Sequence, residues 1–155
     1  MSWKDFLTWL ISILVKPQPS PTPSPTPSPN PNPSPNSFID KLLNLHNTHR
    51  KSIGIGLLTL NTALTNAAQK HTNWMLKNNN LNHNENGKTP GQRITEEGYR
   101  WSAYGENIAF GYSTPEMVFS GWLKSAGHRQ NIESTTYKDV GFGFAGNYWT
   151  TNFAK

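Results

Sequence analysis

The 155-residue chain carries a net charge of +5 and has a pI of about 9.6, and its length allows one domain plus an appendage. Its basic residues are spread singly rather than in runs, so the charge gives no support to a nucleic-acid partner. The absence of cysteine excludes disulfide bonds and cysteine-ligated metal sites, so packing must stabilise the fold.

Residues 1–16 hold an apolar run, Phe6 to Val15, which as a helix is about 15 Å long, about half of a bilayer core. Three interpretations stay open. The run anchors the chain at a membrane without cleavage, docks as a helix into a partner or a larger assembly (a surface assembly or a virion), or is removed as a signal peptide. In each case we expect the rest of the chain to be extracellular or displayed on a surface.

Residues 17–36 are of low complexity, because ten of the twelve prolines occupy every odd position from Pro17 to Pro35. Proline at alternate positions fixes φ and removes amide donors, which favours a polyproline-II-like segment. At about 3.1 Å per residue, twenty residues reach roughly 60 Å. The segment is therefore predicted to be a semi-rigid spacer between residues 1–16 and a domain at 37–155.

Helix starts in the domain are marked by capping residues, such as Asn61 and the Thr114-Pro115 pair. Apolar residues at helical spacing follow each start. These signals predict helices from Ser37 to a break at Lys51–Gly56, from Asn61 to Asn78–Asn80, from Thr89-Pro90 towards Glu97, and from Met117 to Ser125, with a helical turn around His128 to Ile132.

The strand signals are late and short: 106–111, 140–145 and 148–153 are rich in β-forming residues and bounded by Gly or Asn. Asn147 is a natural hairpin turn between the last two. The chain thus begins with helices and continues with strands that are interleaved with another helix. This order indicates an α+β fold with an antiparallel sheet covered by helices.

Three side chains stand out as candidates for chemistry. His128 follows a helix between Gly127 and Arg129, His83 follows the second predicted helix, and Glu106 begins a strand. Two imidazoles and a carboxylate that converge in a cleft can bind a divalent metal or act as a general acid/base pair around water. Equally, a Glu and a His flanked by glycines can form a buried hydrogen-bonded pair that only fixes loops.

The remaining histidines favour structural roles. His71 lies in the middle of a predicted helix near Trp74, which favours packing. We expect His46 and His49 on the outer face of the first helix, and Arg50 with Asn47 to tether that helix to the following loop.

Several motifs carry a resemblance to a known family: LHNTHR at 45–50, AAQKH at 67–71, GENIA at 105–109, GHRxNI at 127–132 and VGFG at 140–143. With these, residues 38–155 resemble a bacterial CAP domain (cysteine-rich secretory protein, antigen 5 and pathogenesis-related 1), also called SCP-like. The resemblance implies an α-β-α sandwich with a short antiparallel sheet.

Many members of that family line a central cleft with two histidines and two acids. By position, His83 and His128 match the histidines and Glu106 matches one acid, whereas Ser125 stands where eukaryotic members have the second acid. Glu85 is close to His83 in sequence but is a weak substitute. The implied binding cleft is therefore His83, Glu106, Ser125 and His128.

The family does not define one activity, and three functions stay open. The first is a non-catalytic binding or interaction module with an unknown ligand in the cleft, displayed on the proline-rich spacer. It is favoured because the second acid is missing, so the chain is more consistent with a binding protein than with an enzyme.

The second is a metal-dependent hydrolase of peptide or cell-wall substrates, in which His83 and His128 hold Zn²⁺ or another divalent metal. Glu106 and His128 would be its catalytic residues, and a variant has Ser125 as nucleophile and His128 as base. The third is a carrier of lipid or another small apolar ligand in an aromatic groove.

Overall fold

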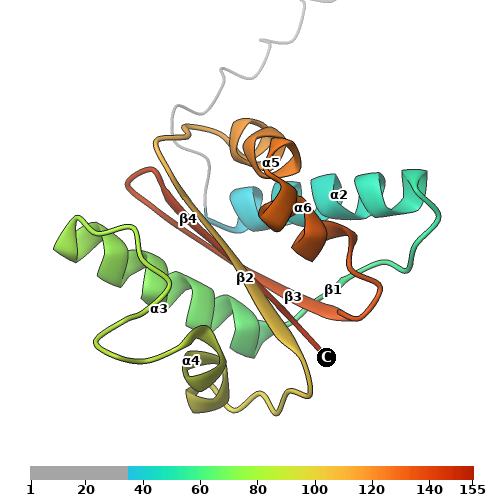
Figure 1. Ribbon diagram of the computed structural model, residues 1–155. Coiled ribbons are helices and arrows are strands. Elements are labelled where there is room, and N and C mark those ends of the chain that lie inside the picture. Colours follow the sequence, from blue (N-terminus) through green and yellow to red (C-terminus); the bar gives the residue numbers. More distant parts are fainter. Residues whose placement is uncertain (1–34) are drawn as a thin grey trace, which may run out of the picture. The chain divides into compact units, whose positions relative to one another are not determined.

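The computed structural model describes residues 35–155, so the interpretations of 1–16 and most of the proline-rich segment lie outside the described residues. Figure 1 shows the elements in chain order. They are α2 (Pro35–Ser52), β1 (Thr59–Leu60), α3 (Thr62–Asn78), α4 (Pro90–Glu96), β2 (Tyr104–Phe110), α5 (Pro115–Lys124), α6 (Ala126–Glu133), β3 (Asp139–Ala145) and β4 (Tyr148–Ala154).

The helices begin where local capping chemistry predicts. Asn61 accepts hydrogen bonds from the N–H groups of Ala63 (2.9 Å) and Leu64 (3.2 Å), which caps α3. Thr89 and Gln92 form a capping box at the start of α4. Three helices differ from prediction. Helix α5 begins at Pro115, two residues before the predicted Met117. The first helix starts two residues early, at Pro35, because proline fits the first turn of a helix, and the expected turn around His128 is a full helix, α6.

The sheet has the strand order β1-β3-β4-β2. The pairs β3–β4 and β2–β4 are antiparallel, as predicted, and the hairpin turns at Gly146 (φ 49°) and Asn147 (φ 67°) as a two-residue turn with both φ values positive. The sheet is nevertheless mixed, because Thr59–Leu60 pairs in parallel with Asp139–Val140. Two residues are too few to produce a strand pattern, so β1 was not predicted.

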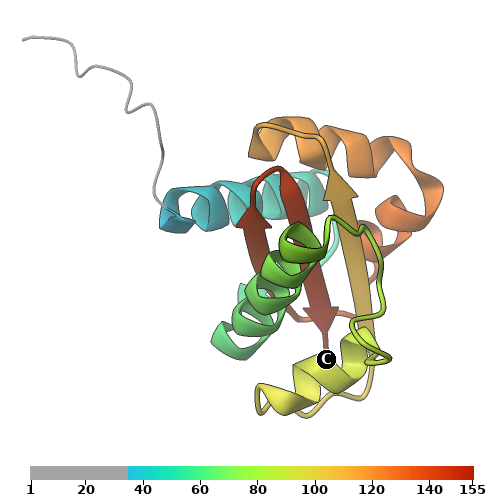
Figure 2. The same cartoon turned by 90° about the vertical axis from the view of Figure 1, so that its left-hand side faces the viewer.

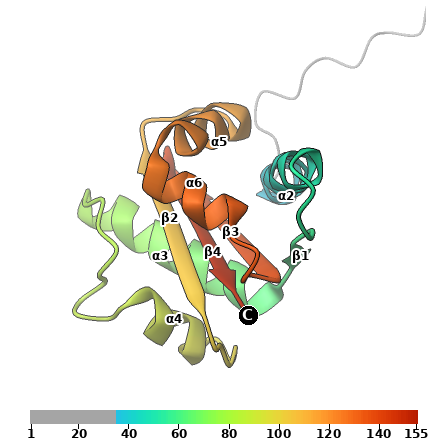
Figure 3. The same ribbon diagram turned by 45° about the vertical axis from the view of Figure 1, so that its right-hand side comes forward.

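Helices cover both faces of the sheet, which confirms the expected α-β-α sandwich. Figure 3 shows α2, α5 and α6 on one side and α3 with α4 on the other. The α3 face depends on two glycines of β3: a Cβ on Gly141 would collide with the backbone of Leu64 and Thr65, and one on Gly143 with that of Ala68. The absence of both side chains lets α3 lie directly on the sheet.

Large aromatic residues fill the layer between the sheet and α2, α5 and α6, with Trp122, Trp149, Phe142 and Phe153 at most 1% exposed. His46 lies among them and is fully buried, so its predicted place on the outer face of the first helix was wrong. His49 is partly exposed and pairs with Glu133 at 2.9 Å. Of the helices in 35–155, none combines the length and the apolar character that a membrane crossing requires.

Candidate functional site

Glu106 is the third residue of β2, and its side chain is only 2% exposed. One carboxylate oxygen, Oε1, lies 2.8 Å from Nδ1 of His83. The other, Oε2, accepts a hydrogen bond from Nη2 of Arg93 at 2.6 Å. With its amide oriented to satisfy both ends, Asn152 of β4 also donates to Oε2 (3.1 Å) and accepts from the N–H of Ala68 (3.2 Å). Both oxygens of Glu106 are thus engaged within the domain.

Arg93 comes from the middle of α4 and is 5% exposed. Besides Glu106, its guanidinium reaches the main chain of the loop between α3 and α4. Nη1 donates to the carbonyl oxygens of His83 (2.8 Å) and Lys88 (3.1 Å). Figure 2, which looks onto α3 and α4, shows this loop running beside β2. Arg93 therefore ties the loop that carries His83 to the strand that carries Glu106.

A second histidine holds the same loop from the side of α3. His71 is fully buried and stacks on Trp74 with ring centroids 5.8 Å apart. Its Nδ1 lies 3.1 Å from Oε2 of Glu85, and its Nε2 lies 2.9 Å from the carbonyl oxygen of Asn82. Burial lowers the pKa of His71, although nearby carboxylates oppose the shift. The structural role expected for His71 is borne out by these contacts, and Glu85 is used in them rather than beside Glu106.

His128 lies in the first turn of α6 and is partly buried. Asn107 of β2 donates to its carbonyl oxygen at 3.0 Å, and Asn131 donates in turn to Oδ1 of Asn107 at 2.8 Å. Burial lowers the pKa of His128, and the charge of His83 lowers it further. The main chain of His128 is thus tied through Asn107 to β2, the strand that carries Glu106.

Ser125 is the residue between α5 and α6. Its backbone N–H donates to the carbonyl oxygen of Trp122 (3.1 Å), and its own carbonyl accepts from Arg129 (2.9 Å). Its side chain does not cap α6. The contacts of Ser125 that join α5 to α6 are therefore made by its backbone.

The outer edge of β2 is held by side chains rather than by another strand. The carbonyl oxygens of Tyr104, Glu106 and Ile108 accept from Tyr137 (3.0 Å), Asn131 (3.3 Å) and Trp122 (3.4 Å), respectively. These contacts protect the strand edge and fix α5 and α6 against it. They thereby position His128 relative to Glu106.

The residues present do not fit a protein-bound zinc site. Among residues 35–155, no three His, Cys, Asp or Glu side chains come together in an arrangement that could hold a metal ion. Catalytic zinc requires three protein ligands, and the two oxygens of Glu106 already serve His83, Arg93 and Asn152. His83 and His128 alone are too few.

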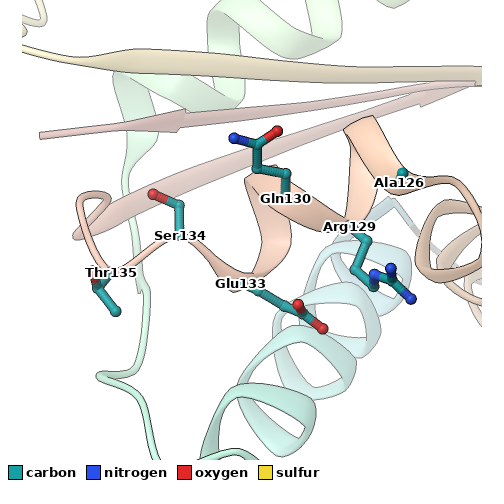
Figure 4. Close-up of a pocket in the computed structure, with 6 residues that line it drawn as sticks. All are labelled: Ala126, Arg129, Gln130, Glu133, Ser134 and Thr135. Carbon is teal, nitrogen blue, oxygen red and sulfur yellow. The ribbon is translucent and has the colours of Figure 1, made fainter.

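A separate hollow of about 470 Å³ lies along α6 and the residues after it. Figure 4 shows Arg129 and Glu133 of its lining pointing toward α2. Its lining is Ala126, Arg129, Gln130, Glu133, Ser134 and Thr135. Because neither His83 nor Glu106 lines it, this hollow is distinct from the His83–Glu106 pair.

Arg93 and Asn152 are the site residues that sequence reasoning missed. Arg93 lies 13 residues from Glu106, and Asn152 pairs across the sheet with it. Alternation along 148–153 could have indicated that Asn152 faces the same side of the sheet as Thr150, but nothing local identifies the partner of either residue. Only the packing of α4 and β4 around Glu106 reveals them.

Comparisons with known proteins agree with this architecture. Residues 43–153 match the family model CAP, described as the cysteine-rich secretory protein family. The chain is 30% identical over 121 residues to the uncharacterized protein YkwD of Bacillus subtilis (strain 168), which covers 76% of this chain and 47% of YkwD. It is 31% identical over 116 residues to the uncharacterized membrane protein YlbC of the same organism, covering 74% and 34%.

A solved structure also superposes on the chain. It is an extracellular protein containing a SCP domain from Bacillus anthracis str. Ames, with a TM-score of 0.74 and 26% identity over 80% of this chain and 44% of that one. This chain thus spans less than half the length of each of the three proteins. The chain belongs to the CAP family, which confirms the expected family and fold.

Proposed function

We propose that this CAP-family chain is a non-catalytic binding module, in which His83 and His128 contact the ligand. The observation that carries the proposal is the state of Glu106. A general base must offer a free oxygen to the water it deprotonates. The carboxylate of Glu106 is 2% exposed, and both its oxygens are engaged with His83 and Arg93. The acid of this site therefore supports other residues instead of activating water.

Display outside the cell is the second part of the proposal. The Bacillus anthracis structure is described as extracellular, and YlbC as a membrane protein. A proline-rich spacer before the domain suits a domain that is held away from a surface. The apolar run at 6–15 would then attach the chain to a membrane or to a larger assembly.

Turnover assays test the absence of catalysis. The full chain would be incubated with peptide mixtures and with purified cell-wall polymer, and soluble products would be measured by mass spectrometry. We expect the wild type and His128→Ala to release equal background amounts. Arg100→Gln, which changes an exposed residue of the same domain, is the matched control. Product formation by wild type and Arg100→Gln that is lost in His128→Ala would establish an enzyme instead.

Two further measurements separate the alternatives. Calorimetry with Zn²⁺ should give the same trace for wild type and His83→Ala, because the site has too few ligands. A heat of zinc binding that is lost in His83→Ala would instead support the metal-dependent hydrolase. Native mass spectrometry should show a chain free of lipid, whereas a co-purifying lipid would favour the carrier.

A further inference from the structure

We infer that Arg93 is the positioning residue of this site: acting through Glu106, it holds His83 with the proton on Nδ1 and leaves Nε2 as a hydrogen-bond acceptor for the ligand. The inference rests on the proposed binding function and names the chemistry of the ligand group that His83 takes. That group donates a hydrogen bond, as a hydroxyl or an amine does.

The guanidinium of Arg93 restrains His83 in two ways. Nη2 of Arg93 bonds Oε2 of Glu106, while Nη1 bonds the carbonyl oxygen of His83 itself. The planar, forked guanidinium fixes these two directions relative to each other. The main chain of His83 and the carboxylate that faces its ring are therefore held by the same side chain.

The bond to Glu106 decides which ring nitrogen of His83 carries the proton. An ionised carboxylate only accepts hydrogen bonds, so Nδ1 must carry the hydrogen between His83 and Oε1 of Glu106. In the neutral ring the lone pair then lies on Nε2. Because the side chain of His83 is 51% exposed while that of Glu106 is 2% exposed, the ring can meet a ligand.

The positive charge of Arg93 is buried. The guanidinium of Arg93 is 5% exposed, and two of its nitrogens are bonded inside the domain. The guanidinium of Arg93 is thus not available to a ligand, and what the half-exposed ring of His83 offers is the lone pair of Nε2. Burial is the main cause that lowers the pKa of His128.

Nitrogen-15 NMR of the full chain tests the assignment. Correlations from ring carbon protons to both ring nitrogens report which nitrogen of His83 is protonated at pH 7.5. We expect protonated Nδ1 in the wild type. Arg93→Gln should release Glu106 and give a mixture of the two tautomers, and Arg93→Lys, which keeps the charge but loses the fork, should fall between them. Arg100→Gln should match the wild type.

The outcomes are decisive in either direction. A wild-type His83 protonated on Nε2 would overturn the inference, and so would an unchanged Nδ1 tautomer in Arg93→Gln. If Arg93→Gln loses its fold by circular dichroism, the wild-type tautomer and the Arg93→Lys spectrum still decide. Inorganic phosphate should leave the His83 nitrogens unmoved, and a saturable shift would contradict a guanidinium of Arg93 that is engaged inside the domain. None of these results bears on turnover, so the binding proposal stands or falls separately.

Discussion

Two buried histidines on opposite faces of the sheet show how differently one residue type can be used. His46 and His71 are both fully buried. His46 lies in the aromatic layer, 4.8 Å from Phe119 and 5.1 Å from Phe142 between ring centroids, and makes one hydrogen bond, between Nδ1 and the carbonyl oxygen of Leu42. His71, on the α3 face, has partners for both ring nitrogens.

His46 contributes to core packing, whereas His71 positions the loop between α3 and α4. The surroundings of His46 under α2 and α5 are aromatic and aliphatic, and Nε2 of His46 has no hydrogen-bond partner there. The face covered by α3 and α4 carries a polar network from His71 and Glu85 to Arg93 and Glu106. That network ends at the half-exposed His83, so the polar face positions this histidine, whereas His128 comes from α6 on the other side of the sheet.

The largest expected effect is on the polar face. Arg93→Met leaves the buried carboxylate of Glu106 without its cation and should lower the free energy of unfolding by about 3–5 kcal/mol. Urea denaturation measures the loss, and Arg100→Met should change it by less than about 0.5 kcal/mol. A double variant with Glu106→Gln should recover part of the stability, because no unpaired charge is left. An Arg93→Met protein as stable as wild type would mean that the ion pair contributes little.

The next effect belongs to the apolar face and depends on pH. Burial is the main reason that the pKa of His46 falls from 6.5 to about 4, with Arg50 and His49 adding repulsion. The unfolded chain therefore binds the proton first as pH falls. The stability from this residue is complete above about pH 6.5 and is lost on acidification to about pH 4, by about 3 kcal/mol.

His46→Leu isolates that effect. Urea midpoints at pH 7 and pH 4.5 should differ less in the variant than in the wild type, because the leucine does not titrate. Carboxylates and His71 titrate in both proteins, so only the difference between them is diagnostic. Equal pH dependence in the two proteins would show that His46 takes up its proton without unfolding the core.

The smallest effect is expected at two neighbouring threonines of β4. Thr150 accepts a hydrogen bond from Thr72 of α3 at 2.7 Å, whereas Oγ1 of Thr151 is buried without a partner. Thr150→Val should cost about 1 kcal/mol, and Thr151→Val should be neutral or stabilising, because it removes an unsatisfied hydroxyl. Thermal denaturation of both variants checks the order. A larger loss in Thr151→Val would contradict the division between a polar and an apolar face.

Local signals carried most of the fold prediction. Asn61 and Thr114 cap α3 and α5 through bonds to residues two or three positions away, and Asn147 turns the hairpin. The short β1 was missed because its two residues are too few to show a strand pattern. The family motifs indicated His83, Glu106 and His128 as site residues, but no sequence pattern paired Arg93 with Glu106. The side of the first helix that faces the sheet was also misjudged, which is why His46 was placed outside.

The sequence by itself determined the order of helices and strands, the family, and three candidate side chains, because capping, periodicity and motifs act over a few residues. Only the tertiary structure decided what those side chains do. The bonds that engage Glu106 and hold His83 join residues 10 to 23 positions apart, and Asn152 of the neighbouring strand β4 adds a bond to Glu106. Burial is also a property of the packed domain, and it makes His46 a neutral core residue and Glu106 a support for His83.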